Sequence, residues 1–102
     1  MKKLKTAVNK FLDRKQKVED NNTAYLYELT MEEIMAIAGD IELMDLNHIT
    51  YLKVVSTIKR NSLGDSEIFA VNMSILNEFM QWSYDRGYIE HDLAYTYNLW
   101  LN

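Results

Sequence analysis

Positively charged side chains are the feature of this sequence that suggests chemistry. Lys53, Lys59 and Arg60 lie close together and are followed directly by Asn61 and Ser62. Lysine and arginine neutralise phosphate groups, while asparagine and serine donate hydrogen bonds to phosphate oxygens or read base edges. The pattern predicts a nucleic-acid contact. The alternative is that Lys59 and Arg60 only complement the negative C-terminal end of a helix.

A second group of cations lies near the N-terminus. Residues 1–17 carry seven Lys and Arg side chains against Asp13 alone, a net charge of +6, although the whole chain carries −4. The remainder therefore carries −10, and a polyanion would be met by the N-terminal segment or by a small local patch. The full set of predicted DNA contacts is Lys53, Lys59, Arg60, Asn61, Ser62, Lys2, Lys3, Lys5, Lys10, Arg14 and Lys15.

Side chains typical of catalytic or metal sites are sparse. The chain has no cysteine, and the two histidines, His48 and His91, are too few and too far apart in sequence to form a zinc site. The three glycines form no phosphate-binding loop, and the tyrosines near the C-terminus stand among carboxylates, which do not activate a nucleophile. We therefore predict no catalytic residue, no cofactor and no metal.

The location of the protein is predicted from what the sequence lacks. No stretch approaches the roughly 18 consecutive apolar residues of a membrane span, and the basic N-terminus lacks the apolar core and cleavage site of a secretion signal. The absence of cysteine fits a reducing compartment. We expect a cytoplasmic protein without a membrane partner, whose oligomeric state the sequence leaves open.

The stretch from Asp65 to Ala94 predicts the element around which the others are arranged. Asp65 and Ser66 are suited to cap a helix, and apolar residues then recur at three- and four-residue steps as far as Ser83. Gly87 can take the left-handed conformation that closes a helix, so this helix is expected to end near Arg86. A last helix, capped by Asp92, is expected to follow.

Three further helices are predicted before that stretch. The first spans residues 3–18, and it either packs as a first helix or remains a loose basic arm. The second runs from Asn22 or Thr23 to Ala38; a break at Thr30 is the alternative, and we expect a continuous helix. The third runs over residues 51–60 with Thr50 as its cap. The expected fold is an all-α, compact bundle of four to five helices.

The predicted helices also indicate the domain organisation. Residues 1–20 form the basic N-terminal helix or arm, and residues 21–102 form a single globular helical unit, since the chain has no internal repeat and no linker-like stretch.

With these elements in place, the chain resembles a known family. Thr23, the Gly39-Asp40 pair, the Ile49-Thr50 pair and Gly87-Tyr88-Ile89 stand in the order of the caps and stops found in the core-binding, SAM-like domain of phage integrases and other tyrosine recombinases. The resemblance covers roughly residues 22–94. In that family the core-binding domain clamps one side of a DNA duplex, and a separate domain carries the strand-transfer chemistry.

The resemblance implies a non-catalytic DNA-binding module of a phage or mobile element, acting in DNA integration or recombination or in its regulation. It implies that the chain is not itself an enzyme and that it binds double-stranded DNA weakly alone. Its further partner would be a recombinase catalytic domain or another protein.

The negative charge of the chain supports a different hypothesis. After residue 17 there are 14 carboxylates. They could face a basic partner, which would make the chain an acidic protein-interaction module, such as a small phage protein that binds or inhibits a host nucleic-acid enzyme. One contiguous concave face of lysines and arginines would favour DNA, and scattered cations would favour a protein partner.

Overall fold

The computed structural model of the chain describes residues 2–93 and confirms the all-α class. Within those residues no strand forms, and a single isolated bridge joins Lys3 to Glu42. The elements in chain order are α1 (Leu4–Val18), α2 (Asn21–Ala38), the short 3-10 turn η1 (Leu43–Asp45), α3 (His48–Asn61) and α4 (Ser66–Asp85). Apart from Leu93, the predicted last helix lies outside the described residues.

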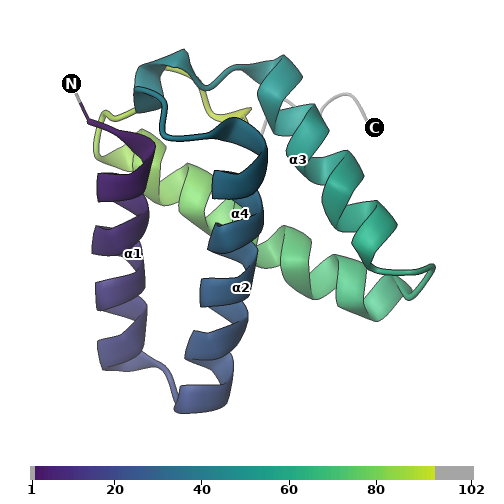
Figure 1. Cartoon of the computed structure of the whole chain (residues 1–102). Helices are drawn as coiled ribbons and strands as arrows, with labels where there is room; N and C mark the ends of the chain where they lie inside the picture. The colour runs from purple at the N-terminus through teal and green to yellow at the C-terminus, as the bar shows by residue number, and fades with distance from the viewer. Residues whose placement is uncertain (1, 94–102) are drawn as a thin grey trace.

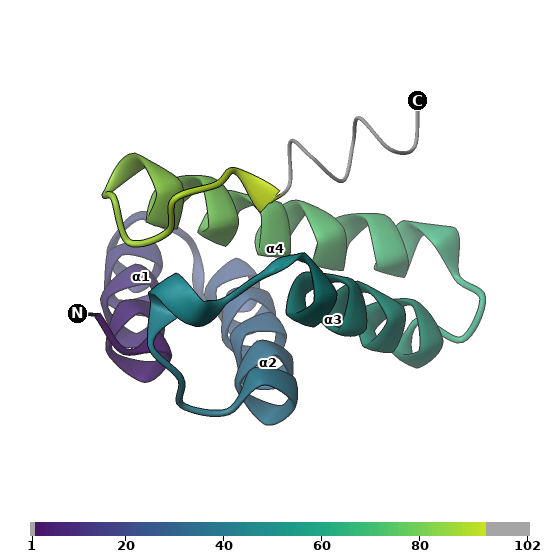
Figure 2. The same cartoon turned by 90° about the horizontal axis from the view of Figure 1, so that it is seen from above.

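The helices form two layers. α1, α2 and α3 lie beside one another, with α2 in the middle, and α4 crosses behind them (Figures 1 and 2). Contacts between α1 and α2, between α2 and α3, and from α4 to both α2 and α3 hold the layers together. Because α2 separates α1 from α3, the two basic segments of the sequence are placed on opposite edges of the front layer.

The predicted start of α4 is confirmed, and the predicted starts of α2 and α3 are corrected. Asp65 caps α4 as predicted, since its Oδ1 accepts hydrogen bonds from two backbone N–H groups of the first turn. α2 is capped by Asp20, whose Oδ1 accepts from the N–H of Thr23 at 2.7 Å, so it begins before the predicted Asn22 or Thr23. α3 is capped by Asn47 rather than Thr50. The N–H of Thr50 donates to Asn47 at 3.0 Å, which places Thr50 inside the helix.

The helix continuity and the glycine stop are confirmed. α2 runs unbroken through Thr30, whose buried hydroxyl donates to the Leu26 carbonyl instead of capping a new helix. Gly87 has a φ of 75° and lies just beyond α4. The N–H of Tyr88 then reaches back to the Ser83 carbonyl at 2.9 Å, which is the bond expected after a left-handed stop.

An aromatic cluster joins α1, α2 and α4 at the centre of the core. Phe11 of α1 is 1% exposed, and its ring centroid lies 5.9 Å from Tyr27, 5.2 Å from Phe79 and 5.4 Å from Trp82. Such tilted and edge-on pairs add to the stabilisation from burial itself. α1 is therefore packed as a first helix, which is the first of the two alternatives that the sequence left open.

Several apolar residues that fit the helical period are exposed. On α2, Tyr25, Leu26 and Leu29 are exposed, and Ile68 at the start of α4 is 50% exposed. Tyr25 and Leu29 stand four residues apart on one side of α2, whereas Leu26 lines an open hollow with Ile68 and Val71 of α4. On α3, the residues Tyr51, Val54, Val55 and Ile58 are buried, and Leu52 is only half-buried. Tyr51 can be buried without leaving its hydroxyl unpaired, because the hydroxyl donates a hydrogen bond to Asn77 Oδ1 at 2.6 Å.

Candidate nucleic-acid interface

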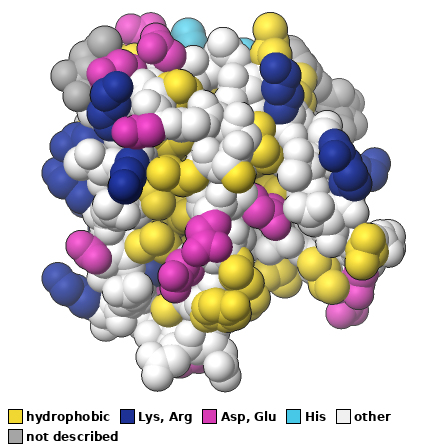
Figure 3. Space-filling model, viewed as in Figure 1, with side chains coloured by type: hydrophobic (Ala, Val, Ile, Leu, Met, Phe, Trp, Pro, Cys, Tyr) yellow, Lys and Arg dark blue, Asp and Glu magenta, His cyan; other side chains and the backbone are white. Residues whose placement is uncertain are grey.

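Charge is segregated by helix. α1 carries five lysines and arginines against Asp13, while α2 and α4 carry carboxylates and no lysine or arginine. α3 carries Lys53, Lys59 and Arg60 and no carboxylate. In Figure 3 the Lys and Arg side chains gather at the two lateral edges of the front face, with acidic and apolar side chains between them. The cations thus form two separate groups rather than the one contiguous concave face that would most favour DNA, so each group has to be judged by its own surroundings.

The exposed side of α3 carries what we call the α3 stripe, defined by Lys53, Ser56, Thr57 and Arg60. These residues stand at steps of three and four, so they follow one side of the helix over two turns. They border an open hollow of about 510 Å³. Its other lining residues are Ile37 of α2 and Ile49 and Leu52 of α3. Two cations and two hydroxyls therefore face solvent together, with no carboxylate lining the hollow.

The other predicted contacts on this segment differ in their position. Lys59 and Asn61 are exposed, but Lys59 is turned from Arg60 by about 100° around the helix. Ser62 is corrected: it is 3% exposed, and its Oγ donates to the Ile58 carbonyl at 2.7 Å. Because this hydroxyl completes the C-terminal turn of α3 from inside the protein, Ser62 is not available to a nucleic acid.

Lys15 is the second predicted contact that points inward. Its ammonium forms an ion pair with Glu78 of α4, and its side chain is only 14% exposed. It also lies 5.0 Å from the ring centroid of Tyr27, whose hydroxyl donates to Glu78 Oε1 at 3.1 Å. This network fixes α1 to α2 and α4, so we assign Lys15 to the stability of the fold and remove it from the candidate interface.

The network around Glu78 predicts a loss of stability at high pH. Burial and the Glu78 charge raise the pKa of Tyr27 above its ordinary value of 10.0. Burial alone would lower the pKa of Lys15, but the hydrogen bond and charge of Glu78 outweigh it and raise that pKa above 10.5. As pH rises, the unfolded chain loses both protons first, so the free energy of unfolding should be constant up to about pH 9.5 and fall above about pH 10.

Urea unfolding followed by circular dichroism at about pH 8 and about pH 11 would measure this loss. In Glu78→Gln the amide retains a hydrogen-bond acceptor for Tyr27 but removes the charge, so the decline should be smaller. An equal decline in both proteins would show that Glu78 does not raise these pKa values.

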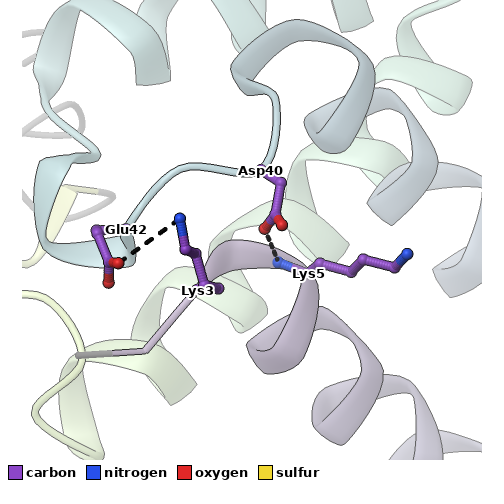
Figure 4. A network of polar contacts seen from close by, with 4 residues as sticks. All are labelled: Lys3, Lys5, Asp40 and Glu42. Atoms are coloured by element: carbon purple, nitrogen blue, oxygen red, sulfur yellow. Dashed lines mark hydrogen bonds and ion pairs between the residues drawn. The ribbon is translucent and has the colours of Figure 1, made fainter.

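The N-terminus of α1 is tied to the segment that connects α2 to α3. Lys3 Nζ lies 3.6 Å from Glu42 Oε1, and the backbone N–H of Lys5 donates to Asp40 Oδ1 at 3.2 Å (Figure 4). The Lys5 side chain extends away from Asp40. The charge of Lys3 is therefore partly compensated, and Lys5 remains an exposed cation beside α2.

The remaining predicted contacts lie on the opposite side of α1 from α2, near α4. Arg14 lines a hollow of about 380 Å³ together with Trp82 of α4 and Arg86, the residue that follows α4. Lys2 lies 5.3 Å from the Tyr88 ring centroid. Arg86 was not predicted as a contact, nor were Ser56 and Thr57. Ser56 and Thr57 could have been predicted from the sequence, because they stand three and four residues after Lys53 on the same helix. The position of Arg86 could not, because it depends on how α4 packs against α1.

Within residues 2–93 no group of three or more His, Asp or Glu side chains is arranged to hold a metal ion. None of the helices described there combines the length and apolar character needed to cross a membrane. Comparison with models of protein families, with curated protein sequences and with solved structures found no match.

Proposed function

We propose that this chain is a non-catalytic DNA-binding module and that the α3 stripe is a contact with the duplex. The observation that carries the proposal is the composition of α3, which holds three cations and no carboxylate in a chain with a net charge of −4. The sequence resemblance to the core-binding domain of tyrosine recombinases motivates the proposal through the glycine stops at Gly39 and Gly87, whereas Thr23 and Thr50 lie inside helices. On this proposal the chain holds DNA for an integration or recombination reaction whose chemistry belongs to another domain.

The chemistry of the stripe fits a sugar-phosphate backbone. Lys53 and Arg60 have no ion pair among residues 2–93, so binding a phosphate breaks no existing salt bridge. Ser56 and Thr57 lie between them and can donate to phosphate oxygens or to base edges. Each neutralised phosphate releases counterions, which makes the affinity fall with salt concentration.

Binding of a short fluorescent duplex, followed by anisotropy, tests the proposal. Two phosphate contacts give a slope of about −1.8 for the logarithm of the association constant against that of salt concentration. The affinity should therefore fall at least about tenfold between about 50 and 200 mM salt. An absence of duplex binding at the low-salt end, or an affinity indifferent to salt, would contradict the proposal.

An acidic protein-interaction module is the second candidate, and one surface favours it. Leu26 of α2 and Ile68 and Val71 of α4 are exposed and line a hollow of about 290 Å³ together with Glu67. Such an apolar surface beside carboxylates, on two helices that have no lysine or arginine, is suited to a basic protein. This candidate predicts no duplex affinity at physiological salt, so the same anisotropy experiment distinguishes the two.

A further inference from the structure

A second group of cations surrounds two aromatic rings where α1 meets the end of α4. We call it the α1 edge, defined by Lys2, Lys10, Arg14 and Arg86. The guanidinium of Arg86 lies 4.8 Å from the Trp82 ring centroid. Lys2 stacks over Tyr88, and Tyr88 itself contacts Trp82 edge-on at 5.6 Å. The rings hold Arg86 and Lys2 at the surface without neutralising them.

The ammonium groups of Lys2 and Lys10 lie close together. The neighbouring Lys10 side chain lowers the pKa of Lys2, because a second positive charge nearby disfavours the protonated form. Like charges in such proximity repel unless an anion stands between them. Two neighbouring cations beside Arg14 therefore make a local positive field at this edge of an acidic protein.

Two carboxylates beside the α1 edge are already engaged, while Asp13, the residue before Arg14, is an exposed carboxylate on α1 itself. Asp85 accepts a hydrogen bond from Gln81 Nε2 at 2.8 Å, and Glu78 is paired with Lys15 and Tyr27. None of the four cations of the α1 edge forms an ion pair with another residue between 2 and 93. Glu78 and Asp85 still line the same hollow as Arg14 and Arg86, so they weaken the positive field there. We therefore expect this edge to bind an anion less tightly than the α3 stripe does.

The α1 edge and the α3 stripe cannot lie on one straight path. α2 runs between α1 and α3 in both views of the fold (Figures 1 and 2). It presents the exposed carboxylates of Glu28 and Glu32 to the side of α1 that faces it, where they line a hollow with Lys5. A phosphate backbone that continued from one basic group to the other would have to pass these charges, at an electrostatic cost.

From this placement we propose that the chain bridges two separate DNA duplexes, one on the α3 stripe and one on the α1 edge. This inference rests on the proposed function and adds a second, weaker binding surface to it. The chain then acts as a connector between DNA segments, and the two helices between and behind the contacts, α2 and α4, carry carboxylates and no lysine or arginine.

A capture experiment tests the bridge. One biotin-labelled duplex is immobilised on beads, and a second, fluorescent duplex of different sequence is added with the chain at low salt. We expect the wild-type chain to retain the fluorescent duplex. In Lys10→Ala/Arg14→Ala the retention should fall about tenfold or more, while the affinity for a single duplex in solution falls less than about threefold. Lys53→Ala/Arg60→Ala should also lose retention.

The outcomes separate the bridge from the proposed function. Single-duplex binding without retention of a second duplex overturns the bridge and leaves the proposed function standing. Retention that survives Lys10→Ala/Arg14→Ala overturns it as well, because a dimer with one contact per copy would behave in this way. Capture of a polyglutamate peptide in place of the second duplex assigns the α1 edge to an acidic protein. Absence of any duplex binding overturns both proposals. Lys10 and Arg14 are exposed, so circular dichroism should show both variants folded.

Discussion

Replacing Phe11 by alanine is expected to lower the free energy of unfolding by about 4 kcal/mol. Phe11 is almost fully buried and contacts rings of both α2 and α4, so the truncation leaves a cavity at the point where three helices meet. Small domains have a total stability of about 5–15 kcal/mol, and the loss is a large fraction of it. Urea unfolding followed by circular dichroism would measure the change.

Val18→Ala is the matched control for this substitution. Val18 is the last residue of α1 and is 67% exposed, so its truncation should change the free energy of unfolding by less than about 0.5 kcal/mol. If Phe11→Ala also cost less than about 1 kcal/mol, α1 would be a loosely attached basic arm. The α1 edge would then have no fixed position relative to Trp82 and Arg86.

The ends of the helices were predictable because their signals are local. An aspartate before a helical pattern or a glycine after one acts on groups within the same turn, and Asp65 and Gly87 do so here. The start of α3 shows where this stops. Asn47 and Thr50 are both good caps, and the residues between them can be helical, so local preference does not choose between the two. In the fold, Asn47 takes the capping position and Thr50 is its donor.

Which side of a helix is buried could not be read from the sequence of that helix alone. Tyr25, Leu26 and Leu29 fit the helical period of α2, yet all three are exposed, and Leu26 is so even though it borders α4. Burial is decided by the positions of the neighbouring helices. The periodicity of the apolar residues therefore predicted the helix α2 correctly, but it predicted only part of the side that is buried.

The candidate site was predictable to the same degree. Lys53 and Arg60 are exposed and share a hollow, in agreement with the expectation that the end of the third helix presents cations. Lys15 was misplaced because the carboxylate that holds it, Glu78, lies on a helix far along the chain. Ser62 was misplaced because serine near a helix end bonds equally well to a backbone carbonyl or to an external phosphate.

Replacing both Lys53 and Arg60 by alanine is expected to weaken duplex binding about tenfold at low salt. The two side chains supply the positive charge of the α3 stripe and are not involved in the core, so the variant should remain folded and lose at most about 1 kcal/mol, the contribution of Arg60 at the C-terminal end of α3. The binding that remains would come from the weaker α1 edge. Anisotropy with the same duplex measures both affinities.

Lys59→Ala is the control that decides whether position matters or only charge. Lys59 is adjacent to Arg60 in sequence and equally cationic, but it does not line the hollow of the α3 stripe. Arg60→Ala alone should therefore cost several times more affinity than Lys59→Ala, about threefold or more against less than about 1.5-fold. Equal losses from the two single substitutions would mean that DNA is attracted by the general field of α3, and the stripe would not be the contact.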